Sequence, residues 1–242
     1  MKALTVLVVD DDTDFAQSFG DLIRFYGHEV REVSNAAAAL DAIESASFDL
    51  IFLDIRMPGQ SGLDVYPTLR ERCPRACIVF STAFIDDVDR RSNQDVLHAE
   101  LLEKPSGINR LEQVIRRVAG EFELLLVGDD VVVRELHQAL RHRGYQVLRA
   151  RSINSAADTL LSESGDKVSV VVGYHTVEEN RLLDLDHLLD EAGMALPFVC
   201  VNAPGGVATP SVRPDRIQQL GPTVSLMGVL DAIDRGAEHF VV

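Results

Sequence analysis

The sequence predicts two doubly wound α/β domains in tandem, each with a parallel β-sheet covered by helices on both faces. Short, nearly continuous apolar runs alternate with amphipathic helical stretches along the chain. This pattern is typical of parallel strands that are buried on both sides. The length of 242 residues suits two domains of about 120 residues each. The second half also repeats the motif order of the first, with a domain-sized period that indicates duplication. We therefore expect two (βα)5 units, over residues 1–120 and 121–242.

The first predicted unit alternates between strands and helices. Its short apolar runs predict strands at Thr5–Val9, His28–Val33, Leu50–Leu53, Cys77–Ser81 and Leu101–Leu102. Between them, apolar residues at helical spacing predict helices near residues 13–26, 36–46, 62–72, 86–95 and 107–119.

The second half repeats these motifs in the same order. Its segments are LLLVGDD (124–130), RGYQV (143–147), VSVVVG (168–173), FVCVN (198–202) and LGP (220–222). The segments of the first half to which they correspond are VLVVDDD (6–12), YGHEV (26–30), DLIFLD (49–54), IVFST (78–82) and EKP (103–105). A second parallel sheet built on the same scheme is therefore expected.

The composition argues against binding to nucleic acids and membranes. The net charge is −15, which divides into −7 over residues 1–120 and −8 over residues 121–242. A nucleic-acid binder needs a basic footprint to neutralise phosphates, and neither half has a Lys/Arg cluster. No apolar run approaches the roughly 18 residues of a membrane span, and the apolar start is better explained as a buried strand than as a signal peptide. Three cysteines without metal-ligand spacing are typical of reduced thiols, so a cytoplasmic location is expected.

Polar residues stand at the ends of four predicted strands of the first half. Asp10 and Asp11 follow the first strand, Asp54 the third, Thr82 the fourth and Lys104 the fifth. The carboxyl ends of parallel strands gather along one edge of the sheet, where ligands of open α/β sheets bind. Three carboxylates in one crevice repel one another unless a cation holds them. Oxygen ligands without His or Cys predict a hard divalent ion such as Mg²⁺.

These residue types predict phosphoryl chemistry. Asp54 can attack phosphorus as a carboxylate nucleophile and form an acyl phosphate, while Mg²⁺ offsets the developing charge. Lys104 and Thr82 can contact the remaining phosphoryl oxygens. Taken singly, each residue has a simpler explanation, because an Asp pair after a strand is commonly a helix N-cap and a Lys-Pro pair is commonly a turn. Their joint placement at four strand ends favours an active pocket.

The motifs VLVVDDD, LDIRMPGQSG, FSTA and EKP, in this order and spacing, resemble the signature of bacterial response-regulator receiver domains. The resemblance covers essentially all of residues 1–120 and implies a flavodoxin-like fold. It implies that Asp54 is the phospho-acceptor and that Thr82 and Lys104 act with it. The implied metal-binding residues are Asp10, Asp11, Asp54 and, through its main-chain carbonyl, Arg56. A cis peptide bond before Pro105 is also implied.

Three positions in this half bear on how such a switch would work. The aromatic residue that many receivers carry three positions before the lysine is Leu101 here, so signalling by rotation of an aromatic ring is not expected. Arg56 and Phe84 lie two residues beyond Asp54 and Thr82, where the family's residues influence access of water to the acyl phosphate. We hypothesise that the bulk of Phe84 slows hydrolysis.

The second half is predicted to be a pseudo-receiver that has lost this chemistry. The phospho-acceptor position falls on Gly173 or Tyr174. Asn202 falls near the position that corresponds to the switch threonine, and Gly221 takes the place of the lysine. Without a carboxylate nucleophile no acyl phosphate can form, so phosphorylation is not expected. Asp129 and Asp130 remain as a partial acid pair, interpreted as solvated or capping residues. The stretch 202–214 holds three Pro and two Gly, so regular helix is not expected there.

The resemblance implies a phosphorylation-controlled response regulator of a two-component or phosphorelay pathway, not an enzyme with a separate substrate. The expected phosphodonor is a sensor histidine kinase or a histidine phosphotransfer protein. The expected output is contact with a downstream protein or a second copy of the chain, because no DNA-binding output segment is visible. Two alternatives remain, a phosphorylation-independent scaffold and a phosphohydrolase of the haloacid dehalogenase type. The order of the motifs opposes the second, because there the nucleophile follows the first strand. The second half could also serve only as a packing partner of the first.

Overall fold

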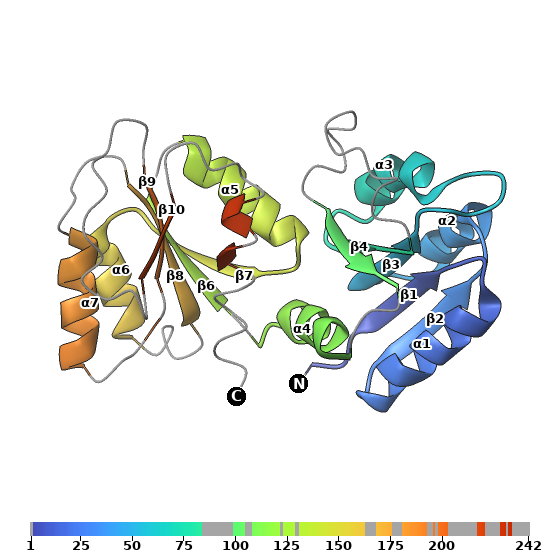
Figure 1. Cartoon of the computed structure of the whole chain (residues 1–242), viewed down its shortest axis with the longest axis horizontal. Coiled ribbons are helices and arrows are strands. Elements are labelled where there is room, and N and C mark those ends of the chain that lie inside the picture. Colours follow the sequence, from blue (N-terminus) through green and yellow to red (C-terminus); the bar gives the residue numbers. More distant parts are fainter. Residues whose placement is uncertain are drawn as a thin grey trace. The chain divides into compact units, whose positions relative to one another are not determined.

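The computed structural model describes residues 2–83, 99–104, 108–121, 123–128, 131–162, 168–175, 181–192, 196, 198–202, 217–220, 228–230 and 232–233. The chain divides into two compact units (Figure 1). The first comprises Met1–Gly120 with His142–Gly144, and the second comprises Glu121–Arg141 with Tyr145–Val242. Among the described residues, no helix has both the length and the apolar character of a membrane span.

The first unit is built on a five-stranded parallel sheet. Its strands are β1 (Thr5–Val9), β2 (Glu29–Val33), β3 (Leu50–Asp54), β4 (Cys77–Thr82) and β5 (Glu100–Glu103), and their order in the sheet is β2-β1-β3-β4-β5. The helices are α1 (Thr13–Phe25), α2 (Ala36–Ser45), α3 (Gly62–Arg72) and α4 (Ile108–Val118). This strand order places β1 and β3 side by side at the point where the chain reverses its direction across the sheet, which is where ligands bind in open α/β sheets.

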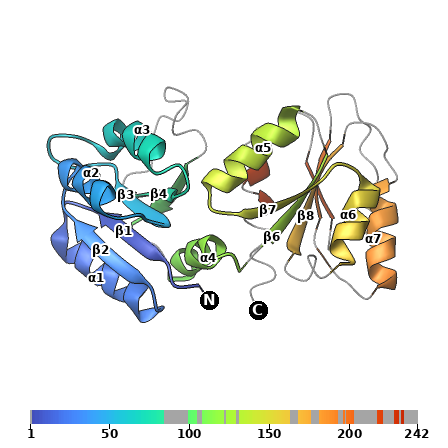
Figure 2. The same ribbon diagram turned by 180° about the vertical axis from the view of Figure 1, so that it is seen from behind.

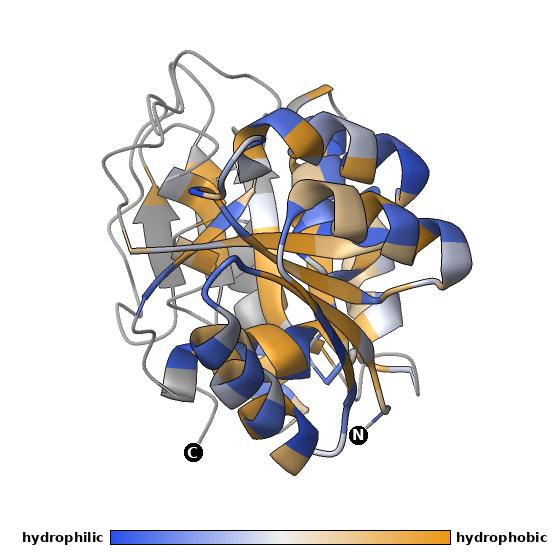
Figure 3. Cartoon of the chain, turned by 90° about the vertical axis from the view of Figure 1, so that its right-hand side faces the viewer, coloured by the Kyte–Doolittle hydropathy of each residue, from blue (hydrophilic) through white to orange (hydrophobic). Residues whose placement is uncertain are grey.

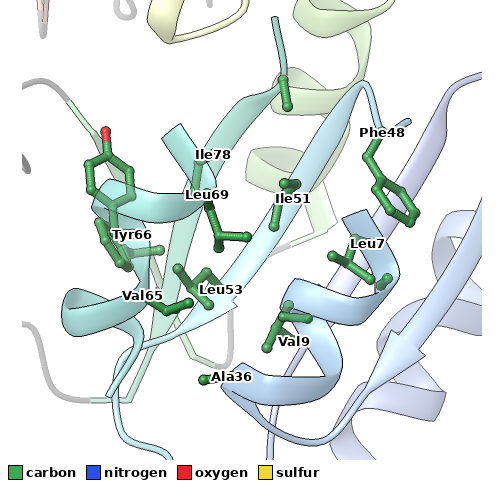
Figure 4. Packing of buried hydrophobic residues seen from close by; sticks show 14 of the residues in the cluster. Leu7, Val9, Ala36, Phe48, Ile51, Leu53, Val65, Tyr66, Leu69 and Ile78 are labelled. Carbon is green, nitrogen blue, oxygen red and sulfur yellow. The ribbon is translucent and has the colours of Figure 1, made fainter. Parts of the chain in front are cut away.

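Two apolar layers cover the two faces of this sheet, because alternate residues of a strand point to opposite sides. On one face, Leu7, Val9 and Leu53 pack against α2 and α3, as Figure 4 shows. On the other face, Val8 and Phe52 belong to a layer that includes residues of α1 and α4. Figure 2 shows the ribbon from behind, and Figure 3, coloured by hydropathy, shows hydrophobic strands inside and hydrophilic positions on the helices around them.

The second unit repeats this topology. Its strands are β6 (Glu123–Val127), β7 (Gln146–Ala150), β8 (Val168–His175), β9 (Phe198–Asn202) and β10 (Ile217–Leu220), all parallel, in the order β10-β9-β8-β6-β7. Its helices are α5 (Val131–His142), α6 (Ile153–Leu160) and α7 (Arg181–Glu191), and residues 228–230 and 232–233 are also helical. One apolar layer joins the sheet to α5 and to residues 229, 230, 232 and 233, and the other joins it to α6 and α7.

The predicted fold class is confirmed, and most element bounds agree with the structure to within one or two residues. The strand predicted at Leu101–Leu102 is longer, because Glu100 and Glu103 also pair with β4. The helix predicted near 107–119 is α4. The predicted helix 86–95 and the stretch 203–214 lie outside the described residues. Cys73 and Cys77 carry free thiols, and burial raises the pKa of the Cys77 thiol to about 11.

Candidate functional site

Three carboxylates converge at the carboxyl ends of β1 and β3. Asp10 and Asp11 directly follow β1, and Asp54 is the last residue of β3. One carboxylate oxygen from each residue lies within 4.8 Å of those of the other two. Asp10 and Asp54 are buried, with 2% and 6% of their surface exposed, while Asp11 is exposed. The predicted acidic cluster is therefore assembled, with two oxygens inside the protein and one at its surface.

Lys104 supplies the positive charge of this pocket. Its Nζ atom lies 2.5 Å from Asp10 Oδ2 and 3.2 Å from Asp54 Oδ1. Its side chain is 15% exposed, so the two ion pairs are largely shielded from water. The main-chain N–H of Lys104 donates a hydrogen bond of 2.8 Å to the carbonyl oxygen of Thr82. The fifth strand end is thereby fixed to the fourth, which brings Thr82, 1% exposed, to the same edge as the lysine.

The capping role that could have explained the acidic run belongs to a different residue. Asp12 is the N-cap of α1, and its side chain accepts a 3.0 Å hydrogen bond from the N–H of Phe15. Asp10 instead accepts a hydrogen bond from the N–H of Asp12, at 3.1 Å, through its second carboxylate oxygen. Asp10 and Asp11 are therefore not needed as helix caps.

Burial and mutual repulsion disfavour the charged forms of the two buried acids. Desolvation raises the pKa of Asp54, and the nearby Asp10 adds to this, while Lys104 opposes it. Desolvation also raises the pKa of Asp10, again against the opposing effect of Lys104. One lysine therefore does not fully offset two buried carboxylates. A further cation in the pocket would therefore favour the charged forms of both acids.

Replacing Asp54 by Asn should stabilise the fold at neutral pH by about 1 kcal/mol. The pKa of Asp54 is raised in the folded state, so folding favours the protonated side chain. This contribution to stability is fully present below the ordinary pKa of an aspartate and is lost as the pH rises through the raised pKa. The ionised side chain thus costs stability at pH 7, and the benefit of Asn should shrink toward pH 4. Urea unfolding at both pH values measures this. The exposed Asp41→Asn is the control, and equal effects of the two variants would contradict the expectation.

The loop after β3 holds Asp54 in place. Gly62, the first residue of α3, donates a 3.0 Å hydrogen bond to the carbonyl of Ile55. A Cβ atom at Gly62 would lie 2.1 Å from the main-chain oxygen of Asp54, so only glycine permits this approach. The helix start is fixed by a capping box between Ser61 and Asp64. Gly62 was not predicted as a residue of the site, although it is the last residue of the motif LDIRMPGQSG.

The other predicted residues of the first half have mixed outcomes. Arg56 is placed just after the acid cluster with an exposed side chain, and its predicted carbonyl contact to a metal stays a prediction. Leu101 lies in β5 and is half-buried. Phe84 and Pro105 lie outside the described residues. Phe15 was not predicted, although its ring lies against Lys104, with Nζ 4.6 Å from the ring centroid.

Strand register locates the corresponding positions of the second unit. The N–H of Gly128 donates to the carbonyl of Ala150 at 2.8 Å, as the N–H of Asp10 donates to Val33 at 3.0 Å. Gly128 thus stands where Asp10 stands in the first unit. Val9 pairs with Leu53, and the corresponding Val127 pairs with Gly173. The register therefore places Tyr174, one residue further, at the position of Asp54 and resolves the ambiguity between Gly173 and Tyr174.

The fourth and fifth strands of the second unit extend the comparison. Asn202 corresponds to Thr82, as the sequence predicted, because β9 pairs with β8 as β4 pairs with β3. In the fifth strand Leu220 corresponds to Leu102. Gly221, the predicted counterpart of Lys104, lies outside the described residues, as do Asp129 and Asp130.

The first unit is similar in sequence to a known family and to curated proteins. Residues 6–116 match the family described as response regulator receiver domain. A response regulator receiver protein of Anaeromyxobacter sp. (strain Fw109-5) is 31% identical over 149 residues, which are 61% of this chain and 62% of that protein. The transcriptional regulatory protein TcrX of Mycobacterium tuberculosis (strain ATCC 25618 / H37Rv) is 29% identical over 148 residues, which are 58% and 63% of the two chains. The alignments thus span less than two thirds of these relatives.

One solved structure resembles the chain along almost its whole length. It is described as a two-component system response regulator/GGDEF domain protein, and it covers 98% of both chains with a TM-score of 0.72 and 17% identity. At this identity the likeness concerns the fold alone, and it extends over both units.

The first unit thus combines a doubly wound parallel sheet with an acid cluster and a lysine at the carboxyl edge of that sheet. Residues 6–116 are a response regulator receiver domain of the two-component systems.

Proposed function

We propose that the first unit is a phosphorylation-controlled switch, with Asp54 as the phospho-acceptor and Mg²⁺ as its cofactor. The observation that carries the proposal is the convergence of Asp10, Asp11 and Asp54 within 4.8 Å, with Lys104 paired to the two buried acids. In this proposal the chain is a response regulator that takes its phosphoryl group from a sensor histidine kinase or a histidine phosphotransfer protein. It is not an enzyme with a substrate of its own.

The donor set of the pocket fits Mg²⁺. All three side chains offer carboxylate oxygens, which this hard cation prefers, and Asp11 leaves one side of the cluster open to water. Burial raises the pKa values of Asp10 and Asp54 against the opposing effect of Lys104, and a divalent cation would favour their charged forms. The main-chain carbonyl of Arg56 is proposed as a further ligand. When bound, the ion supplies charge neutralisation to the carboxylates and to a phosphoryl oxygen.

The residues of the pocket then divide the chemistry among them. An Asp54 carboxylate oxygen forms a bond to phosphorus as the bond between phosphorus and the imidazole nitrogen of the donor breaks, which leaves an acyl phosphate on Asp54 and a neutral histidine on the donor. Lys104 lies 3.2 Å from Asp54, close enough for its ammonium to turn to a phosphoryl oxygen. The Thr82 hydroxyl is proposed to bind another of these oxygens.

Phosphorylation is expected to shift the ends of β4 and β5 together. The added charge and acceptor oxygens attract Thr82 and Lys104, whose backbones are joined by the 2.8 Å hydrogen bond. Because Leu101 replaces the common aromatic residue, we expect the change to pass through the backbone after β4 and not through a rotating ring. The fraction of the chain in the active conformation then depends on how much more strongly that conformation binds the phosphoryl group than the inactive conformation does.

The second unit is proposed to be a pseudo-receiver that is not phosphorylated. Gly128 and Tyr174 stand at the positions of Asp10 and Asp54, so these two positions offer neither a carboxylate nucleophile nor the buried acid beside it. We propose that it acts as an adaptor surface for output by protein contact. A downstream protein or a second copy of the chain is the expected partner. Nucleic acid is not, because the net charge is −15.

Intact mass spectrometry tests this proposal. The chain is incubated with acetyl phosphate and Mg²⁺, and one added phosphoryl group per chain is expected. Asp54→Asn and omission of Mg²⁺ should each abolish the added mass, whereas Asp41→Asn should leave it unchanged. No added mass on the wild-type chain would favour the scaffold alternative, and two phosphoryl groups would overturn the account of the second unit.

A further inference from the structure

The Lys104 ammonium has a third neighbour besides the two carboxylates. It lies over the ring of Phe15, with Nζ 4.6 Å from the ring centroid. A cation within about 6 Å of an aromatic face is attracted by the negative potential of the ring. Because Lys104 is only 15% exposed, water weakens this attraction less than it would at the surface. The lysine is thus held by two carboxylates, those of Asp10 and Asp54, and by an uncharged aromatic face.

The ring of Phe15 is itself firmly held. Phe15 lies in the first turn of α1, where its N–H donates to the N-cap side chain of Asp12 at 3.0 Å. Its ring stacks on Phe19 with centroids 5.4 Å apart. Phe19 in turn packs edge-on against Phe52 of β3, at 4.9 Å. This stack connects the ring to the buried strand that ends in Asp54, so the position of the ring is fixed relative to the pocket.

We propose that Phe15 is a positioning residue for Lys104, which keeps the ammonium at the pocket when its carboxylate partners are engaged by a metal ion. This inference rests on the proposed function. In the metal-free pocket the ion pairs with Asp10 and Asp54 are sufficient to hold the lysine. Both carboxylates are proposed metal ligands, so their attraction for Lys104 falls when the ion binds. The aromatic face cannot ligate Mg²⁺ and remains available to the lysine.

An aromatic face suits this task better than a third acid. A further carboxylate would add negative charge beside two acids whose burial already disfavours their charged forms, and it would compete with the phosphoryl group for Lys104. A purely aliphatic side chain would fill the space without attracting the ammonium. Phe15 therefore limits where Lys104 can go without changing the charge of the site.

Phosphorylation rates of Phe15 variants test the proposal. At saturating Mg²⁺ and a fixed concentration of acetyl phosphate, Phe15→Leu should slow the appearance of phosphorylated chain by about three- to tenfold. Phe15→Tyr, which keeps the aromatic face, should retain a rate close to that of the wild type. Replacing Phe15 by a ring-fluorinated phenylalanine, which weakens the ring potential at nearly constant size, should slow the reaction without disturbing the packing. Equal rates for all of these variants would overturn the proposal.

A double-mutant cycle separates positioning from packing. If Phe15 acts through Lys104, the slowing caused by Phe15→Leu must disappear in a Lys104→Ala background. Persistence of the same fold-change in that background would assign Phe15 a structural role only and refute the inference. Phe25→Leu, at an exposed ring on the same helix, controls for loss of an aromatic side chain. Failure of the wild-type chain to gain a phosphoryl group would instead contradict the proposed function itself.

Discussion

Replacing Glu100 by Ala should lower the free energy of unfolding of the first unit by about 3–5 kcal/mol. Glu100 is 2% exposed in β5, and each of its carboxylate oxygens binds an arginine of α4. Arg110 contacts Oε1 at 2.9 Å, and the buried Arg117 contacts Oε2. Glu100→Ala removes the carboxylate that binds the Arg117 guanidinium. Water cannot readily replace this carboxylate, because only 5% of the Arg117 side chain is exposed. Most of the expected loss in the free energy of unfolding comes from the weaker compensation of this buried positive charge.

Hydrogen exchange of the β1 and β3 amides in the full chain measures this loss, because these strands lie at the centre of the first sheet. Two further variants show its origin. Arg110→Ala removes an arginine that is 34% exposed and should cost no more than about 1 kcal/mol. Replacing Glu100 and Arg117 together by Leu should recover much of the stability, because neither charge of the buried pair then remains. A loss below about 1 kcal/mol for Glu100→Ala would show that water reaches the Arg117 guanidinium.

The ion pairs of Glu100 could not be predicted from the sequence. A charged residue next to a short apolar run indicates a strand end, and for that reason the predicted strand covered only Leu101–Leu102. The partner Arg117 lies 17 residues further along the chain, on a different element. Whether these two side chains meet depends on how α4 packs on the sheet, and no local pattern contains that information. The same holds for Phe15, whose spacing to Phe19 predicts a helix face but not the contact with Lys104.

The acid cluster was predictable because its geometry follows from topology alone. Once the apolar runs are assigned to parallel strands, the residues directly after them must gather at one edge. The pattern of strands is therefore enough to place Asp10 and Asp54 together. In the second unit the same reasoning left Gly173 and Tyr174 as alternatives, since loop lengths there differ from those of the first unit. The hydrogen-bond register decided between them, because it shows which residues of neighbouring strands lie side by side, whatever the lengths of the loops between the strands.

Replacing Gly62 by Ala should destabilise the first unit by about 2–3 kcal/mol and should slow phosphorylation of Asp54. The new Cβ would lie 2.1 Å from the main-chain oxygen of Asp54 and 3.1 Å from Cγ of Leu53. Neither atom can move easily, because both residues belong to β3, which is paired with β4 as far as Asp54. Relief of the clash must therefore displace α3 or the end of β3, and the second displacement moves the proposed nucleophile relative to Lys104.

Gly20→Ala provides a matched control for this effect. A Cβ at Gly20 would also meet an atom at 2.1 Å, but that atom is Oε1 of Glu32, at the end of a flexible side chain. Glu32 can turn away at the cost of its contacts with Arg24, and alanine gains about 1 kcal/mol of helix propensity over glycine. We therefore expect a net change below about 1 kcal/mol for Gly20→Ala and an unchanged rate of phosphorylation. Urea unfolding and intact mass measurements on both variants compare the two sites, and similar losses at Gly20 and Gly62 would show that the backbone of β3 yields as readily as a side chain.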